Sequence, residues 1–399
     1  MRELPKIISV DDHVVEPPTV WSDRLPSRYV EAGPKVVRAP VGPIQYVGGR
    51  LSLSMAAPGE GRPADWWIYE DLRRPLLRLD AAAGYDRDEV DMRAITFEDM
   101  RPGAWQVGPR LEDMDTNWIE ASLCFPTFPR FCGQTFLEAK DKDLARLCVR
   151  AFNDWMVEEW CAPTGGRLIP LIIVPLWDAQ LAAAEVTRNA ARGVRAVCFS
   201  EIPPFLGLPS VHDADGYWNP FFRACEDSGT VINMHIGSSS KMPSTSADAP
   251  AAVGSTLTFA NAACSLTDWL MSGVFYRFPK LVIAYSEGQI GWIPYILERA
   301  DVVWEENRGW GGVADKVKEP PSELFRRHVY GCFFNDAHGL RSLDDIGADR
   351  VTYESDYPHS DSTWPNTRQV AEKQMEDLDD EIVEMILRSN AIRMLGLDR

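Results

Sequence analysis

An aspartate and a histidine two residues apart follow the first apolar run of the sequence. Residues 7–16 read IISVDDHVVE, and the pair is Asp11 and His13. Because side chains alternate between the two faces of a β-strand, both would point to the same side. A carboxylate and an imidazole at this spacing can bind one divalent ion without distorting the backbone. An isolated pair of this kind more often has structural roles than a role in metal binding. The carboxylate then caps a turn, and the histidine is a core residue whose ring nitrogens are hydrogen-bonded.

Three more residues of the same chemical types occur where later apolar runs end. His235 lies near the end of TVINMHI, Glu287 follows LVIAYS, and Asp356 ends RVTYESD. Two imidazoles and up to three carboxylates make a site suited to Zn, Mn or Fe, and a dipositive ion would offset the repulsion between the carboxylates. This chemistry requires that distant segments of the chain meet in one place.

The elements that would position these residues alternate between strands and helices. Helix-like stretches at 136–160, 178–193, 220–227, 293–307 and 366–397 separate short β-rich runs. The predicted strands are the run that starts at residue 7, followed by 121–126, 168–176, 194–200, 230–236, 281–285, 328–334 and 350–356. Residues 168–176, LIPLIIVPL, are almost continuously apolar, as is typical of a parallel strand buried on both faces.

Eight such strands without a linker or an internal repeat predict one domain over residues 1–399, a (β/α)8 TIM barrel. The segment 17–108 is rich in Pro and Gly, contains a hairpin-like piece at 34–54, and is predicted to be an insertion after the first strand that covers the site. Residues 365–399 are predicted to close the outer ring with helices. Since the carboxyl ends of all barrel strands open on one rim, Asp11, His13, His235, Glu287 and Asp356 are expected to meet there.

Composition excludes several classes of protein. The chain has 399 residues, 45% of them hydrophobic and 25% charged, which is an ordinary globular balance, and its formal net charge is -18. A charge of this sign argues against nucleic acid and anionic membranes as partners. The eight cysteines form no C-x-x-C pair and suggest buried thiols in a reducing compartment. With neither a signal peptide nor an apolar run long enough to cross a membrane, a cytoplasmic location is expected.

The motifs together resemble a known group of enzymes. D-x-H in the first predicted strand, NMHIG in the fifth, SEGQIGWIPYILERAD at the sixth and SDYPHSDSTWP at the eighth are similar to the amidohydrolase superfamily. They are most similar to the amidohydrolase-2 branch, which includes aminocarboxymuconate-semialdehyde decarboxylase. The likeness covers nearly the whole chain and implies a TIM barrel, a small-molecule substrate and a homodimer.

The resemblance also implies one divalent metal ion per subunit, with zinc as the first choice and Mn or Fe as alternatives. Its ligands would be Asp11, His13, His235 and Asp356, with Asp11 where many members have a histidine. Glu287 occupies the place of a histidine that many members carry in an HGG turn, and the resemblance favours it as the acid/base residue while Asp356 stays on the metal. Asp356 and His235 are the other catalytic candidates.

Three further residues are candidates for substrate binding. His359 lies just past Asp356 in the Y-P-H turn, where it can contact the substrate or the ligands, or cap the turn. His212 lies in the loop after the fourth strand, and Arg130 in the Pro-rich loop after the second can pair with a carboxylate. The alternative for His212 and Arg130 is a solvated surface side chain.

Three functions remain open. The leading one is a metal-dependent hydrolase in which a metal-activated water attacks a small organic acid, amide, ester or related carbonyl compound. The alternative is a non-oxidative, metal-dependent decarboxylase of an aromatic or unsaturated acid, the activity of several members of the branch. The third is a barrel without chemistry that serves in binding or assembly, which would need a defective metal site.

Overall fold

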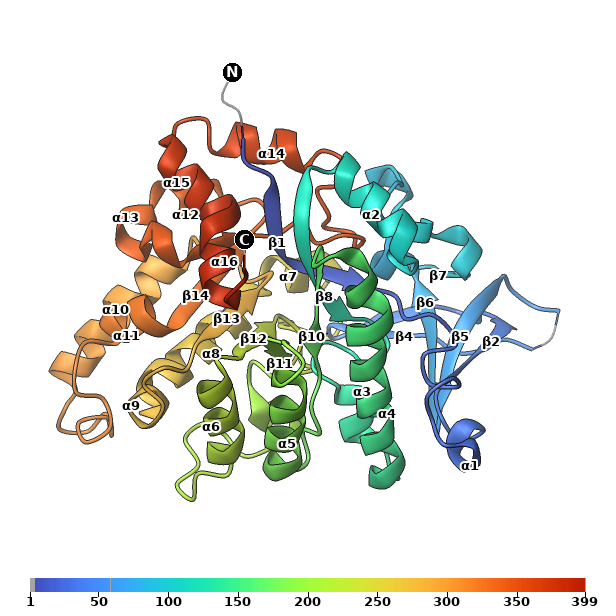
Figure 1. Ribbon diagram of the computed structural model, residues 1–399, viewed down its shortest axis with the longest axis horizontal. Coiled ribbons are helices and arrows are strands. Elements are labelled where there is room, and N and C mark those ends of the chain that lie inside the picture. Colours follow the sequence, from blue (N-terminus) through green and yellow to red (C-terminus); the bar gives the residue numbers. More distant parts are fainter. Residues whose placement is uncertain (1–3, 58, 399) are drawn as a thin grey trace.

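Eight parallel strand positions form the centre of the molecule. The computed structural model describes residues 4–57 and 59–398 and shows the strands surrounded by helices (Figure 1). In chain order the central strands are β1 (Ile7–Val14), β8 (Ile119–Pro126), β9 (Leu168–Ile169) with β10 (Leu171–Ile172), β11 (Ala196–Cys198), β12 (Val231–His235), β13 (Ile283–Ser286), β14 (Val329–Phe333) and β15 (Val351–Tyr353). The predicted strands are confirmed, although several of them are shorter than expected.

The strands are ordered around a ring. β1, β8 and β9 pair in parallel, and so do β10 through β15, each with the next along the chain. Only Pro170, which has no N–H to donate, separates β9 from β10. At the other end, the N–H of Asp356 donates to the carbonyl of Asp11 (2.9 Å), and that of His13 to Tyr357 (2.6 Å). The residues after β15 therefore pair with β1, and the arrangement is that of a TIM barrel.

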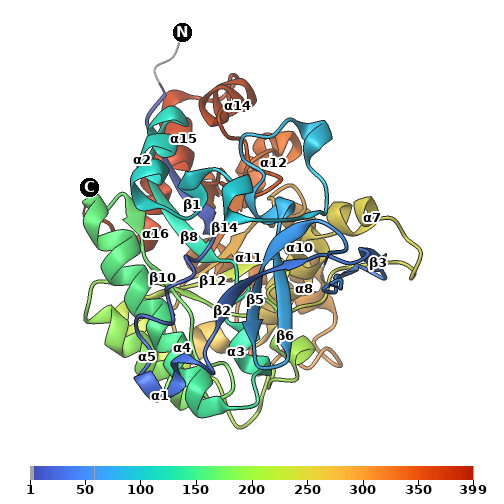
Figure 2. The ribbon, with the colours of Figure 1, turned by 90° about the vertical axis from the view of Figure 1, so that its right-hand side faces the viewer.

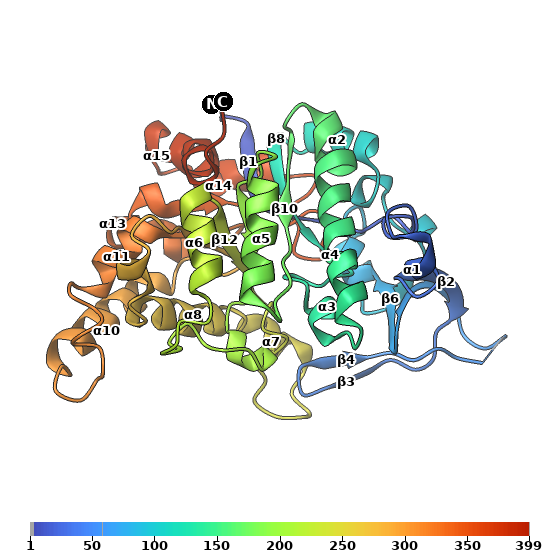
Figure 3. The same cartoon turned by 60° about the horizontal axis from the view of Figure 1, so that its bottom comes forward.

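Helices connect the strands and cover the outside of the ring, as α4, α5 and α6 do side by side in Figure 3. Each of these three helices has buried residues, such as Leu144, Ala182 and Phe222. The principal helices are α2 (Val107–Thr116), α4 (Lys142–Trp155), α5 (Ala179–Ala190), α6 (Asn219–Ser228), α8 (Phe259–Met271), α10 (Ile293–Glu306), α11 (Pro321–His328) and α14 (Thr367–Gln374). Shorter ones are α1 (Ser27–Val30), α3 (Gln134–Glu138), α7 (Ala251–Thr256), α9 (Val274–Arg277), α12 (Ala337–Arg341), α13 (Leu343–Ile346), α15 (Asp380–Glu384) and α16 (Asn390–Leu395). In the part of the chain that the structure describes, no helix is long and apolar enough to cross a membrane.

The predicted helix 136–160 is wrong in its extent. α3 ends at Glu138, and α4 begins after Asp141, whose carboxylate accepts the N–H of Leu144 (2.9 Å) and so caps a new helix. After Trp155 the chain continues as a π-helical turn, 156–161. The start predicted at Asp178 is confirmed, since that side chain accepts N–H groups of the first turn of α5.

Residues between β1 and β8 form a separate small sheet. β2 (Lys35–Pro40), β5 (Pro63–Tyr69), β6 (Leu72–Leu77) and β7 (Ala94–Ile95) are antiparallel, and β3 (Gln45–Val47) pairs with β4 (Arg50–Ser52) (Figure 2). The hairpin expected at 34–54 contains β3 and β4 and continues through an antiparallel bridge between Val41 and Met55, whereas the preceding β2 pairs with the distant β5. Trp67 of β5 packs on Phe128 in the loop after β8, with ring centroids 4.7 Å apart. This contact holds the sheet against a loop at the carboxyl end of the barrel.

Asp12 joins the first and last strands of the barrel. Its buried carboxylate accepts hydrogen bonds from Ser9 Oγ (3.0 Å), Ser355 Oγ (2.6 Å) and the N–H of Tyr357 (3.0 Å), and from Ser122 Oγ of β8. Because side chains alternate along β1, Asp12 points away from the side shared by its two neighbours. Asp12 is thus a structural carboxylate of the barrel wall.

Candidate metal centre

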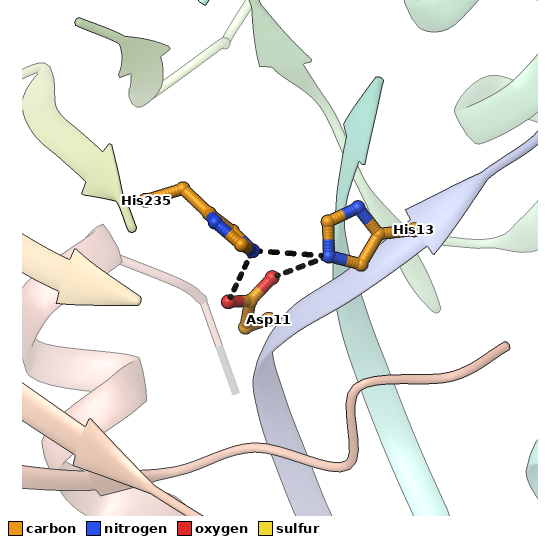
Figure 4. Close-up of side chains that lie close together, drawn as sticks. All are labelled: Asp11, His13 and His235. Atoms are coloured by element: carbon orange, nitrogen blue, oxygen red, sulfur yellow. Dashed lines mark hydrogen bonds and ion pairs between the residues drawn. The ribbon is translucent and has the colours of Figure 1, made fainter. Parts of the chain in front are cut away.

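Three side chains converge at the carboxyl ends of β1 and β12. The Nε2 atoms of His13 and His235 are 3.2 Å apart. One carboxylate oxygen of Asp11 lies 3.4 Å from His13 Nε2 and the other lies 3.3 Å from His235 Nε2. Figure 4 shows the two rings and the carboxylate turned toward one common point. Three donor atoms with room for an ion between them are the elements of a metal site.

A second trio shares His13 and extends the cluster to the last strand. Asp356 Oδ1 is 3.4 Å from His13 Nε2 and 3.2 Å from His359 Nδ1. The rings of His13 and His359 stack with centroids 3.5 Å apart. The structure therefore brings together all four residues expected to bind metal, Asp11, His13, His235 and Asp356, and adds His359 next to them.

Unpaired buried atoms test whether these residues fit a cation. Asp11 and Asp356 are 0% exposed, yet none of their four carboxylate oxygens has a hydrogen-bond donor. A buried carboxylate without a partner is costly, whereas a divalent cation would satisfy both groups at once. Together with two imidazoles this donor set suits a first-row divalent metal.

The protonation states of the two histidines also fit a role as metal ligands. His235 Nδ1 lies 2.6 Å from the carbonyl oxygen of Ile236 and must donate to it, which leaves the lone pair of Nε2 free to bind. Burial lowers the pKa of His235 to about 3, and it holds the pKa of His13 well below the usual range. Both imidazoles are therefore neutral near pH 7, as a metal ligand must be.

The carboxyl groups are shifted in the opposite direction. Burial, followed by repulsion from Glu354 and Glu287, raises the pKa of Asp11 well above its usual range. Burial and the neighbouring Asp361 do the same to the pKa of Asp356. Without a cation these groups therefore retain protons at a pH where exposed carboxyls have lost them.

Metal binding should consequently tighten as the pH rises. The cation needs Asp11 and Asp356 as carboxylates, so it must displace their protons, and the apparent Kd should keep falling, with proton release, at pH values above those at which exposed carboxyls ionise. The two neutral histidines contribute nothing to this change. Calorimetric titration with Mn²⁺ in two buffers of different ionisation enthalpy measures both quantities. An affinity that is flat above about pH 6, without proton release, would indicate binding to ordinary exposed carboxylates instead.

Glu287 connects the cluster to a large cavity. It follows β13, and its Oε2 lies 3.6 Å from His235 Nε2. Burial, followed by repulsion from Asp356, holds the pKa of Glu287 well above its usual range. The cavity has a volume of about 720 Å³ and is lined by Glu287, Asp356 and His359 together with aromatic side chains. A carboxyl group with a raised pKa thus lines a space large enough for a small organic molecule.

Left-handed backbone conformations aim two of these carboxyls. The backbone angle φ is 55° at Glu287 and 51° at Asp356, values that residues other than glycine rarely adopt. Strain of this kind persists only where surrounding contacts impose it, and it concentrates at functional sites.

The three candidates for substrate binding have different positions. His359 is among the residues that line the cavity. His212 lies at the surface with its side chain 36% exposed and pairs with Asp268 at 3.1 Å. Arg130 pairs with Glu138 at 2.7 Å and donates to Ser240 Oγ. Neither is among the residues that line this cavity, since His212 pairs with Asp268 of α8 and Arg130 with Glu138 of α3. Their role in substrate binding stays a prediction.

Sequence reasoning missed two buried acids at the same rim. Glu354, directly after β15, is 0% exposed and is the charged group that most raises the pKa of Asp11. Glu201, after β11, accepts hydrogen bonds from Ser239 Oγ (2.7 Å) and the N–H of Gly237 (3.1 Å), which fixes the loop that follows His235. Glu354 could have been found, since Glu354 and Asp356 show the same two-residue spacing as Asp11 and His13.

Comparisons with known proteins agree with this architecture. A family model described as amidohydrolase matches residues 54–397. Among solved structures, an amidohydrolase from Mycobacterium avium subsp. paratuberculosis K-10 superimposes with a TM-score of 0.70 at 20% identity, over 98% of this chain and 99% of that one. 2,6-Dihydroxybenzoate decarboxylase from Rhizobium superimposes with a TM-score of 0.61 at 17% identity, over 99% of this chain and 100% of that one. A third structure is 5-carboxyvanillate decarboxylase from Novosphingobium aromaticivorans with bound manganese and 3-methoxy-4-hydroxy-5-nitrobenzoic acid. It superimposes with a TM-score of 0.58 at 19% sequence identity, over 74% of this chain and 82% of that one.

At these identities the likeness to solved structures shows the shared fold alone. The first two superpositions extend over almost the whole chain, so the part before residue 54, with β1 and its two candidate ligands, is largely covered by them.

Proposed function

The chain belongs to the amidohydrolase family, and from that premise we propose that it is a metal-dependent decarboxylase of an aromatic or unsaturated acid. The observation that carries the proposal is the position of Glu287, a buried carboxyl 3.6 Å from His235 that lines the cavity. Because burial raises its pKa, Glu287 keeps its proton to a higher pH than an exposed glutamate does and can deliver it to a carbon atom. Decarboxylation requires such an acid, whereas hydrolysis first requires a base.

The names of structural neighbours support the same choice. Two of them are decarboxylases of hydroxylated benzoic acids, and one was solved with manganese and a nitrobenzoic acid. We therefore prefer the decarboxylase to the metal-dependent hydrolase, which the sequence alone had favoured. The manganese of that neighbour also favours Mn²⁺ over zinc for this chain.

The cluster at the carboxyl ends of the strands would hold the cation. Asp11, His13, His235 and Asp356 are its proposed ligands, and a bound divalent cation would offset the negative charge of a substrate carboxylate and its neighbouring oxygen. The hydrogen bond from His235 Nδ1 to Ile236 keeps this ligand in the correct tautomer. His359, stacked on His13, borders both the ligands and the cavity.

In the proposed reaction the protein supplies the proton and positions the ring. Phe131, Phe259, Trp292 and Phe334 line the cavity and offer faces for an aromatic substrate. Glu287 donates its proton to the ring carbon that bears the carboxylate. The bond from that carbon to the carboxylate then breaks, its electron pair stays on the ring, and CO2 leaves. Glu287 regains a proton from solvent.

We further propose a division of the chain around this site. Residues 1–399 would form one domain, 17–108 would act as a cap and 365–399 would complete the outer helices. Leu79 and Asp80 of the cap segment line the cavity. The N–H of Gly48, in the turn between β3 and β4, donates to the carbonyl of Ala247 in the loop after β12 (3.0 Å). Both contacts support a role of this segment as a cap beside the cavity.

Product analysis tests the proposed reaction. The protein loaded with Mn²⁺ is expected to release one CO2 per product from a hydroxylated benzoic acid, with one solvent deuterium at the carbon that lost the carboxylate when the reaction is run in D2O. Incorporation of ¹⁸O from labelled water into a product, without CO2, would support the hydrolase instead.

A further inference from the structure

Glu354 is placed behind the candidate metal centre rather than in it. It lies between β15 and Asp356, and its side chain is completely buried. It belongs to neither group of side chains whose ligand atoms lie within 4.8 Å of one another. A buried glutamate that does not line the cavity and is outside these groups needs another explanation.

The contacts of Glu354 lead to Glu287. Its Oε2 accepts the backbone N–H of Glu287 at 3.1 Å and also a hydrogen bond from Cys332 Sγ. Cys332 lies in β14, and its Sγ is 3.0 Å from the carbonyl oxygen of Tyr285 in β13. The N–H of Glu354 itself donates to Phe333 (3.2 Å). Glu354 is thus held by Cys332 and Phe333 of β14 and presents one oxygen to the peptide N–H of Glu287.

That peptide is the point where the chain leaves its strand in an unusual conformation. Glu287 follows β13 with φ 55°, and Gln289, two residues later, has φ 54°. A left-handed residue other than glycine needs contacts that hold it there. Its N–H, turned into the barrel wall, also needs an acceptor, and Glu354 provides it.

We propose that Glu354 is a positioning residue, which holds Glu287 in the left-handed conformation and so directs its carboxyl group at His235 and the cavity. The inference rests on the proposed function, in which Glu287 is the proton donor. Glu354 acts through Glu287 and does not touch the substrate.

A pair of substitutions of similar size separates the hydrogen bond from simple packing. Glu354→Gln keeps an oxygen acceptor, whereas Glu354→Met fills the space without one. In the Mn²⁺-loaded protein we expect Glu354→Met to lower kcat about 10-fold to 100-fold, with KM and metal content changed less than about 3-fold, and Glu354→Gln to restore most of the turnover.

A double-mutant cycle tests whether the effect passes through Glu287. If Glu354 only positions Glu287, the double variant Glu287→Gln with Glu354→Met should be no slower than Glu287→Gln alone. If the double variant instead lost turnover by the product of the two single losses, Glu354 would have an independent role, and the proposal would be overturned. Normal turnover in Glu287→Gln would instead refute the assignment of Glu287 as the proton donor, which is a failure of the proposed function.

Crystal structures of the variants provide a readout that needs no substrate. Glu287 should leave the left-handed region in Glu354→Met and remain there in Glu354→Gln. Glu16 is a matched control, because this equally buried glutamate accepts the N–H groups of Thr127 (2.9 Å) and Phe128 (2.8 Å) in another loop. Glu16→Met should leave the φ of Glu287 unchanged.

An unchanged φ of Glu287 in Glu354→Met would overturn the proposal. Should Glu354→Met fail to fold, Glu354→Gln still tests the proposal. This variant retains the acceptor, so turnover as low as in Glu287→Gln would contradict the proposal.

Discussion

Replacement of His235 by alanine is expected to remove both the metal ion and the activity. Its Nε2 lies 3.2 Å from His13 Nε2 and 3.3 Å from Asp11, so the variant loses a donor at the centre of the cluster. Two carboxylates would then depend on a single imidazole. Loss even of groups that only support a ligand costs about 10-fold to 100-fold in metal affinity, and loss of the ligand itself should cost more. Element analysis after dialysis should find less than one tenth of the metal bound by the unaltered protein, as follows from a decrease of more than about 100-fold in affinity.

His212→Ala is the matched control. It removes the same side chain, but His212 lies at the surface and pairs with Asp268. This variant should retain the metal and normal turnover. Full metal occupancy in His235→Ala would contradict the ligand assignment.

Replacement of Glu287 by glutamine should have the second largest effect and a different pattern. Glutamine preserves the shape of the side chain but cannot give up a proton, so turnover should fall about 100-fold to 10,000-fold. Glu287 is 3.6 Å from His235 and is not in either candidate group of ligands, so the metal content should stay unchanged. Steady-state kinetics and element analysis of the same preparation measure both values.

Asp361→Asn provides a comparison within the same cavity. Asp361 is also a lining carboxyl, but it is exposed and belongs to neither candidate metal group. Its conversion to an amide should change turnover only a few fold. Normal turnover in Glu287→Gln, or a decrease in Asp361→Asn as large as in Glu287→Gln, would remove Glu287 from the role of proton donor.

Most of the candidate site could be predicted because it lies at strand ends. Alternation along β1 placed Asp11 and His13 on one side, and barrel geometry then placed His235, Glu287 and Asp356 nearby. The same two-residue rule applied to the predicted strand 350–356 would have singled out Glu354 as a further residue to examine. These positions follow from local periodicity and one global arrangement, both of which are readable in a sequence.

Loops and non-local pairings could not be predicted in this way. His212 and Arg130 have the right chemical type, but an unpatterned loop does not say which way a side chain points, and both found other partners. β2 pairs with β5 across more than twenty residues rather than with its nearest neighbour, since the tryptophans of β5 require a covered position. The break between α3 and α4 depends on a single cap at Asp141.

The type of reaction was also beyond the sequence. A mononuclear metal centre serves hydrolysis and decarboxylation alike, and the two differ in what the adjacent carboxyl group does with its proton. Our proposal on this point depends on the burial of Glu287 beside Asp356, and burial depends on the folded structure.

The central claim is that residues from β1, β12 and the end of β15 bind one divalent cation together. An anomalous difference map from crystals of the protein with Mn²⁺ tests it most directly. We predict one strong peak per chain, within ligand distance of Asp11, His13, His235 and Asp356. A protein that binds Mn²⁺ only elsewhere, or whose four side chains remain without a peak at full Mn²⁺ saturation, would contradict it.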